Sequence, residues 1–140
     1  MKASIRFCVA GGGSWGTALA HLLAGLGYDV RLWLRDGEAA ERINQTHENA
    51  RYLPGLPLHP ALRAETDPGV LSADYLVLAI PTQQLRGWLE AHRRHLNASP
   101  VLINAAKGLE VGTLATPSRI VAETLAGTPF RFAALSGPSF

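Results

Sequence analysis

Short apolar runs alternate along the chain with segments whose apolar residues recur at helical spacing. The apolar runs predict strands, at Ile5–Val9, Val30–Leu34, Tyr75–Ile80, Val101–Asn104 and Phe130–Leu135, with a further short strand near Leu62–Ala64. The segments between them predict helices, at Ser14–Leu26, Asp36–Asn44, Gln83–Leu96 and Pro117–Leu125. Tyr75–Ile80 is apolar throughout, as is typical of a parallel strand buried on both faces. The alternation predicts an α/β fold with a doubly wound parallel sheet in the strand order 3-2-1-4-5-6.

Turn and capping residues mark several ends of these elements. Gly27 suits the C-cap of the first helix, and Asp36 and Thr82 suit the N-caps of the second and third. Prolines and a glycine make Glu48–Leu62 a loop. No repeat or low-complexity linker divides the sequence, so residues 1–140 are predicted to form a single domain.

A glycine turn follows the first predicted strand. Gly11, Gly13 and Gly16 have the G-x-G-x-x-G spacing, in which the first glycine permits a tight turn, the second lets the backbone approach a pyrophosphate, and the third lets the helix pack against the strand. The helix that begins near Ser14 directs its free N–H groups at the phosphates. Val30–Leu34 completes a Rossmann-type βαβ unit within ~30 residues. We therefore predict dinucleotide binding, with NADP or NAD as the cofactor.

Arg35 follows the second predicted strand, where a side chain usually selects between the two cofactors. An acidic residue there holds the ribose 2′-hydroxyl of NAD, and an arginine accommodates the 2′-phosphate of NADP. Arg35 therefore favours NADP or dual use. The alternative is a solvated arginine at a strand end, with Asp36 serving only as a helix cap.

Two further segments follow predicted strands at the expected cofactor side of the sheet. Lys107, next to Gly108, would place a compact cation where the nicotinamide meets an anionic substrate. Surface lysines are frequent, so the position alone leaves this role open. Pro81 either shapes a loop against the cofactor or only ends its strand.

Composition narrows the classes of function. Hydrophobic residues make up 47% and charged residues 17% of the chain, which excludes disorder. The net charge of +2, without basic runs between aromatics, gives no reason to expect a nucleic-acid partner. No apolar stretch approaches the ~18 residues of a membrane span, and with no targeting signal we expect a cytoplasmic protein. The lone Cys8 excludes a disulfide within the chain, gives no metal site, and is predicted to be buried and inert.

Five segments, in the same order, resemble the bacterial NAD(P)-dependent sn-glycerol-3-phosphate dehydrogenases. They are Gly-Gly-Gly-Ser-Trp-Gly-Thr-Ala-Leu-Ala (11–20), Arg-Tyr-Leu-Pro-Gly (51–55), Ala-Ile-Pro-Thr (79–82), Lys-Gly-Leu-Glu (107–110) and Leu-Ser-Gly-Pro-Ser-Phe (135–140). That family interconverts sn-glycerol 3-phosphate and dihydroxyacetone phosphate by hydride transfer and supplies precursors for phospholipid synthesis.

The resemblance implies roles for individual residues. Those expected to contact the dinucleotide or the substrate are Ser14, Trp15, Arg35 and, less directly, Tyr52 for the dinucleotide, Lys107 for both, and Gly137 and Ser139 for the substrate. The family's general-base lysine lies in a C-terminal helical domain that these 140 residues do not contain. We therefore expect a domain excised from a longer protein, with the base beyond residue 140 and the isolated chain inactive. The resemblance leaves open a homodimer of the intact enzyme.

Other classes of nucleotide-binding protein fit less well. A short-chain dehydrogenase needs Tyr-x-x-x-Lys, and no tyrosine of the chain has a lysine four residues later. A methyltransferase using S-adenosylmethionine should have an acidic residue where Arg35 stands. A non-catalytic nucleotide-sensing domain stays an alternative, although it gives no reason for the segments at 107–110 and 135–140.

Overall fold

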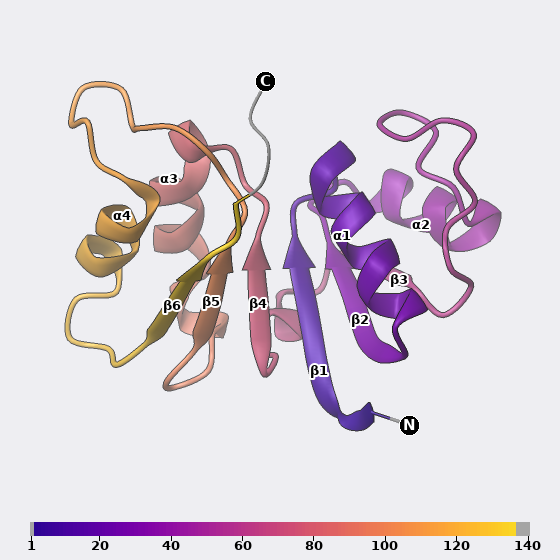
Figure 1. Ribbon diagram of the computed structural model, residues 1–140, viewed down its shortest axis with the longest axis horizontal. Helices are drawn as coiled ribbons and strands as arrows, with labels where there is room; N and C mark the ends of the chain where they lie inside the picture. Colours follow the sequence, from indigo (N-terminus) through magenta and orange to yellow (C-terminus); the bar gives the residue numbers. More distant parts are fainter. Residues whose placement is uncertain (1, 137–140) are drawn as a thin grey trace.

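Six parallel strands form one sheet in the order β3-β2-β1-β4-β5-β6 in the computed structural model, which describes residues 2–136 (Figure 1). The strands are β1 (Lys2–Ala10), β2 (Tyr28–Trp33), β3 (Arg63–Glu65), β4 (Tyr75–Leu78), β5 (Val101–Asn104) and β6 (Arg131–Ala134). The helices are α1 (Ser14–Gly25), α2 (Gly37–Thr46), α3 (Thr82–His92) and α4 (Pro117–Thr124), with short 3-10 segments η1 (Pro68–Leu71) and η2 (Arg93–His95). The predicted doubly wound fold and strand order are confirmed.

Each face of the sheet packs on its own pair of helices. Val77 of β4 joins the cluster that contains Leu19 of α1 and Ile43 of α2. Its neighbours Leu76 and Leu78 join the opposite cluster, with residues of α3 and α4. This alternation explains why the fourth strand is apolar at successive positions, since both of its faces are buried.

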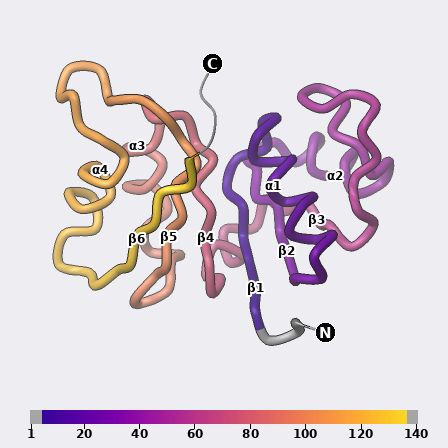
Figure 2. Tube along the Cα trace, viewed as in Figure 1, coloured from indigo at the N-terminus to yellow at the C-terminus, as the bar shows by residue number. Residues whose placement is uncertain are grey.

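The direction in which successive strands are added to the sheet reverses at its centre, between β3 and β4 in the sequence. Residues up to β3 build the half with β1 and β2, and residues from β4 onward build the other half (Figure 2). β1 and β4 are therefore the neighbours at the topological switch point. In sheets of this type, ligands bind at the carboxyl ends of these strands.

The predicted N-cap at Asp36 is present, whereas the C-cap of α1 is Leu26, one residue before the predicted Gly27. Asp36 accepts hydrogen bonds from the backbone N–H groups of Glu38 and Ala39, at 3.0 and 3.2 Å. Gly27, with φ of 93°, follows the end of α1 and donates its N–H to the carbonyl of Ala24, because glycine adopts the left-handed conformation without a Cβ penalty.

The prediction that Thr82 caps the third helix is wrong. α3 begins at Thr82 itself, Pro81 occupies the cap position, and no side chain of residues 2–136 caps the helix. The Thr82 hydroxyl instead donates to the backbone carbonyl of Lys107, at 2.6 Å. This acceptor comes within reach because β4 and β5 pair in the sheet.

Several predicted boundaries also differ from the structure by a few residues. β4 ends at Leu78 rather than at Ile80, and α3 ends at His92 rather than at Leu96. The last turn of the predicted helix tightens into η2, a form that is common at helix ends.

No helix in residues 2–136 has the length and apolar character needed to cross a membrane.

Cys8 lies fully buried in β1, and this burial raises the pKa of its thiol to about 12. Only the thiolate reacts readily with alkylating agents. We expect iodoacetamide at pH 8 to leave the folded chain unlabelled and to label it once urea has unfolded it, as measured by intact mass. Labelling of the folded chain at the rate of the unfolded one would contradict this burial.

Candidate dinucleotide-binding site

The glycine turn brings three backbone segments into close contact. Gly11, with φ of 120°, donates its N–H to the carbonyl of Trp33 at 3.0 Å. A Cβ at Gly11 would overlap the carbonyl oxygen of Ala79, and a Cβ at Gly16 would overlap the carbonyl oxygen of Gly11. The turn therefore requires glycine at both positions, for the backbone reasons that the spacing predicts.

Gly13 differs from these two glycines. Its φ of −77° suits any residue, and a Cβ built there would meet no atom of residues 2–136 within 4 Å. It occupies the cap position of α1, which has no acidic residue in its first turn and no cap from a side chain among the described residues. The first N–H groups of a helix need acceptors from outside it. The turn therefore presents uncapped donors beside open space, as a pyrophosphate requires.

A cavity of about 380 Å³ lies between the start of α1 and the loops that follow β4 and β5. Trp15, whose surface is 51% exposed, lines it together with Pro81, Thr82 and Lys107. The structure thus brings two predicted site residues, Trp15 and Lys107, to one cavity at the switch point. A smaller cavity of about 230 Å³, lined by Arg93 and Asn97, contains none of the predicted site residues.

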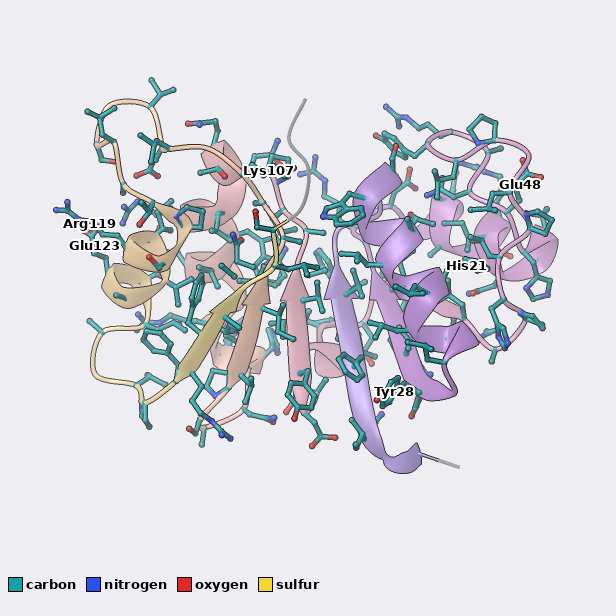
Figure 3. The ribbon with its side chains drawn as sticks, viewed as in Figure 1. His21, Tyr28, Glu48, Lys107, Arg119 and Glu123 are labelled. Carbon is teal, nitrogen blue, oxygen red and sulfur yellow. The ribbon has the colours of Figure 1, made fainter. Side chains whose placement is uncertain are left out.

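Lys107 is an exposed residue at the carboxyl edge of the sheet, as Figure 3 shows. Its carbonyl accepts the hydrogen bond from Thr82, and Asn104 Nδ2 donates to the carbonyl of Ala106 at 2.9 Å. These two bonds fix the position of the backbone that carries the Lys107 side chain.

An ion-pair network holds the loop that follows Lys107. Arg86 of α3 donates Nε and Nη2 to the carboxylate of Glu110, at 3.0 to 3.2 Å, and Nη2 to Glu123 at 3.0 Å. Hydrogen bonds from Arg86 and then Thr113 hold the pKa of Glu110 below its usual value. The same pairing raises the pKa of Arg86 above its usual value. Both charges therefore persist at neutral pH, and the loop is braced against α3.

Two further predicted site residues, Arg35 and Tyr52, lie on other segments. Arg35 is exposed and lies two residues after the end of β2, at the same edge of the sheet. Tyr52 lies between α2 and β3 with 43% of its surface exposed, and its carbonyl accepts a hydrogen bond from Ser14 Oγ at 2.9 Å. Gly137 and Ser139 lie outside the described residues.

The family model described as "NAD-dependent glycerol-3-phosphate dehydrogenase N-terminus" matches residues 6–140. The chain belongs to this family.

Curated relatives of this glycerol-3-phosphate dehydrogenase domain carry the name glycerol-3-phosphate dehydrogenase [NAD(P)+]. That of Desulfovibrio desulfuricans is 59% identical over 140 residues, which are 100% of this chain and 42% of the relative. That of Nitratidesulfovibrio vulgaris is 51% identical over 138 residues, which are 97% of this chain and 42% of the relative. The chain thus spans less than half the length of these relatives.

Solved dehydrogenase structures share the fold of this domain. Glycerol-3-phosphate dehydrogenase from Coxiella burnetii matches with a TM-score of 0.86 and 29% identity, over 97% of this chain and 42% of that one. The enzyme from Saccharomyces cerevisiae matches with a TM-score of 0.80 and 30% identity, over the same shares of the two chains.

Two residues whose side chains bond to the loop after Lys107 or to the glycine turn were not among the predicted site residues. Arg86 reaches Glu110 across 24 residues of sequence, and Asn49 reaches the glycine turn across 37. Neither spacing carries a local signal, because the fold alone brings the partners together. The proline-rich loop that contains Asn49 was the available hint, since long loops in small domains often have a function.

Gly16→Ala tests the backbone contact at the turn. The new Cβ would collide with the Gly11 carbonyl, a backbone atom that cannot move aside cheaply, so we expect a loss of roughly 1–3 kcal/mol or more in the free energy of unfolding. Gly87→Ala in α3 is the matched control, because its Cβ meets open space, and it should gain up to about 1 kcal/mol. Urea unfolding measures both variants, and equal stabilities would contradict the contact.

Proposed function

We propose that this chain is the NAD(P)-binding domain of an enzyme that interconverts sn-glycerol 3-phosphate and dihydroxyacetone phosphate. The observation that carries the proposal is Gly13, a glycine that neither its φ nor its surroundings require. Its place at the uncapped start of α1 is where a pyrophosphate needs close approach to the backbone.

The residues around this turn fit a nicotinamide dinucleotide. The first N–H groups of α1 would hold the pyrophosphate, with Ser14 beside them. Arg35, exposed after β2, would meet the ribose or its 2′-phosphate. Trp15 and Lys107 would flank the nicotinamide half in the cavity they share. When bound, the dinucleotide accepts or supplies the hydride.

Lys107 would orient the substrate. Its ammonium group is a compact charge with three donors, which suits a phosphate or an oxygen on C2. The bonds from Thr82 to its carbonyl and within Asn104–Ala106 would keep it in place at the cavity. Gly137 and Ser139, by the family resemblance, would add contacts to the substrate.

Oxidation of the substrate separates a hydride from a proton. A hydride would leave C2, with the bound dinucleotide as its acceptor, and a proton would leave the C2 hydroxyl for a general base, so that a ketone would form. By the family resemblance this base is a lysine of a helical domain outside the 140 residues. In the reverse direction the product would feed phospholipid synthesis. Dimerisation and a cytoplasmic location stay predictions.

Arg35→Asp tests both the site and the choice of cofactor. A charge-assisted pair between Arg35 and a 2′-phosphate contributes about 1.5–3 kcal/mol, so the affinity for NADPH should fall roughly 10- to 150-fold. The affinity for NADH, which has no such phosphate, should change much less. Calorimetric titration of the chain with each cofactor measures both values.

Arg94→Asp is the control for this experiment. It makes the same change of charge at an exposed arginine of η2, which lies outside the proposed site, and it should leave both affinities unchanged. Equal losses for NADPH and NADH in Arg35→Asp would contradict a 2′-phosphate contact. Absence of binding of either cofactor to the unmodified chain at millimolar concentration would contradict the proposed function.

A further inference from the structure

The segment His47–Leu58 forms a closed Ω-loop between α2 and β3. Leu58 donates its N–H to the carbonyl of His47 at 2.7 Å, which brings the two ends of the loop together. The Gly55 N–H donates to the carboxylate of Glu48 at 3.0 Å, and Figure 3 labels Glu48 in this loop beside α2. Loops of this compact kind often serve a function.

Asn49 joins this Ω-loop to the glycine turn. The residue is 6% exposed, and its side-chain Nδ2 donates to the carbonyl of Gly12 and to Thr17 Oγ1, both at 2.9 Å. Thr17 is fully buried in α1. The Asn49 carbonyl also accepts the N–H of Leu53 at 2.8 Å. One residue thus organises the loop and attaches it to the turn.

A second bond ties the same loop to the first turn of α1. Ser14 Oγ donates to the carbonyl of Tyr52, and the Arg51 guanidinium lies over the Tyr52 ring, 5.1 Å from its centre. Ser14 is exposed, whereas Asn49 is buried. Water can replace the Ser14 bond but has little access to the Asn49 bonds. The hold on the loop therefore depends mainly on Asn49.

We propose that Asn49 is a positioning residue for the dinucleotide, which it does not itself contact. It fixes the Gly12 carbonyl and Thr17 on either side of Gly13 and places Tyr52 beside Ser14. These groups are then already ordered in the folded chain, so cofactor binding does not have to supply the free energy of ordering them. This inference rests on the proposed function of the glycine turn.

Asn49→Ala tests the proposal, with Asn97→Ala as the matched control. Asn97 Nδ2 also donates to a backbone carbonyl of a distant segment, that of Ala73 at 2.7 Å. Both Asn97 and Ala73 precede their strands, β5 and β4, so this bond lies at the opposite edge of the sheet. Each variant loses a partly or fully buried amide bond, and only one loses it at the proposed site.

Three quantities are measured on each chain. They are the thermal midpoint, the Kd for NADPH by calorimetry, and the rate at which trypsin releases the fragment ending at Arg51 without ligand. Both variants should have a lower midpoint. Only Asn49→Ala should bind NADPH about tenfold or more weakly and be cut faster after Arg51, because its loop is no longer held. Saturating NADPH should slow that cleavage.

If Asn49→Ala fails to fold, Thr17→Val tests the proposal in its place. It preserves the shape of the side chain, removes one acceptor of the Asn49 amide, and should shift affinity and cleavage in the same direction by less. Unchanged affinity and cleavage in the folded variants, or equal losses of affinity in Asn49→Ala and Asn97→Ala, would overturn the positioning role. Failure of the unmodified chain to bind NADPH would instead overturn the proposed function, and with it this inference.

Discussion

The contact between the glycine turn and the end of β4 is the constraint on which the rest of the site depends. Gly16 lies against the carbonyl of Gly11, and Gly11 lies against the carbonyl of Ala79. A side chain at either glycine would separate α1 from the two central strands. Because α1 starts there, the contact also determines where its first N–H groups lie, just past the carboxyl end of β1, the strand next to β4.

Side-chain hydrogen bonds between distant segments hold the loops around this contact. Thr82 fixes the backbone of Lys107 from one side, and the Arg86–Glu110 pair braces the following turn from α3. Asn49 fixes the loop on the α1 side. The sheet thus supplies the edge, and a few buried or paired polar groups hold the surrounding loops in place, as preorganised binding sites require.

The sequence predicts best what depends on local chemistry. The strand order follows from alternating elements, the cap at Asp36 from one carboxylate beside free N–H groups, and the turn from the backbone demands of Gly11 and Gly16. Thr82 shows where local reasoning fails, because its hydroxyl binds a carbonyl that only strand pairing brings near. Local reasoning also misses Arg86 and Asn49, because their partners are distant in sequence. The roles of Arg35, Tyr52 and Lys107 in binding stay predictions, since contacts with a ligand are not visible in the chain alone.

The central claim is that the open space at Gly13 is kept for a pyrophosphate. Calorimetric titration of Gly13→Val with NADPH tests it most directly, beside Gly87→Val, in which the new side chain also starts in open space but on α3. Both variants should unfold at or near the midpoint of the unmodified chain, because neither Cβ meets an atom of the described residues within 4 Å. The account predicts that Gly13→Val no longer binds NADPH while Gly87→Val binds it normally. NADPH affinity of Gly13→Val equal to that of the unmodified chain would contradict the account.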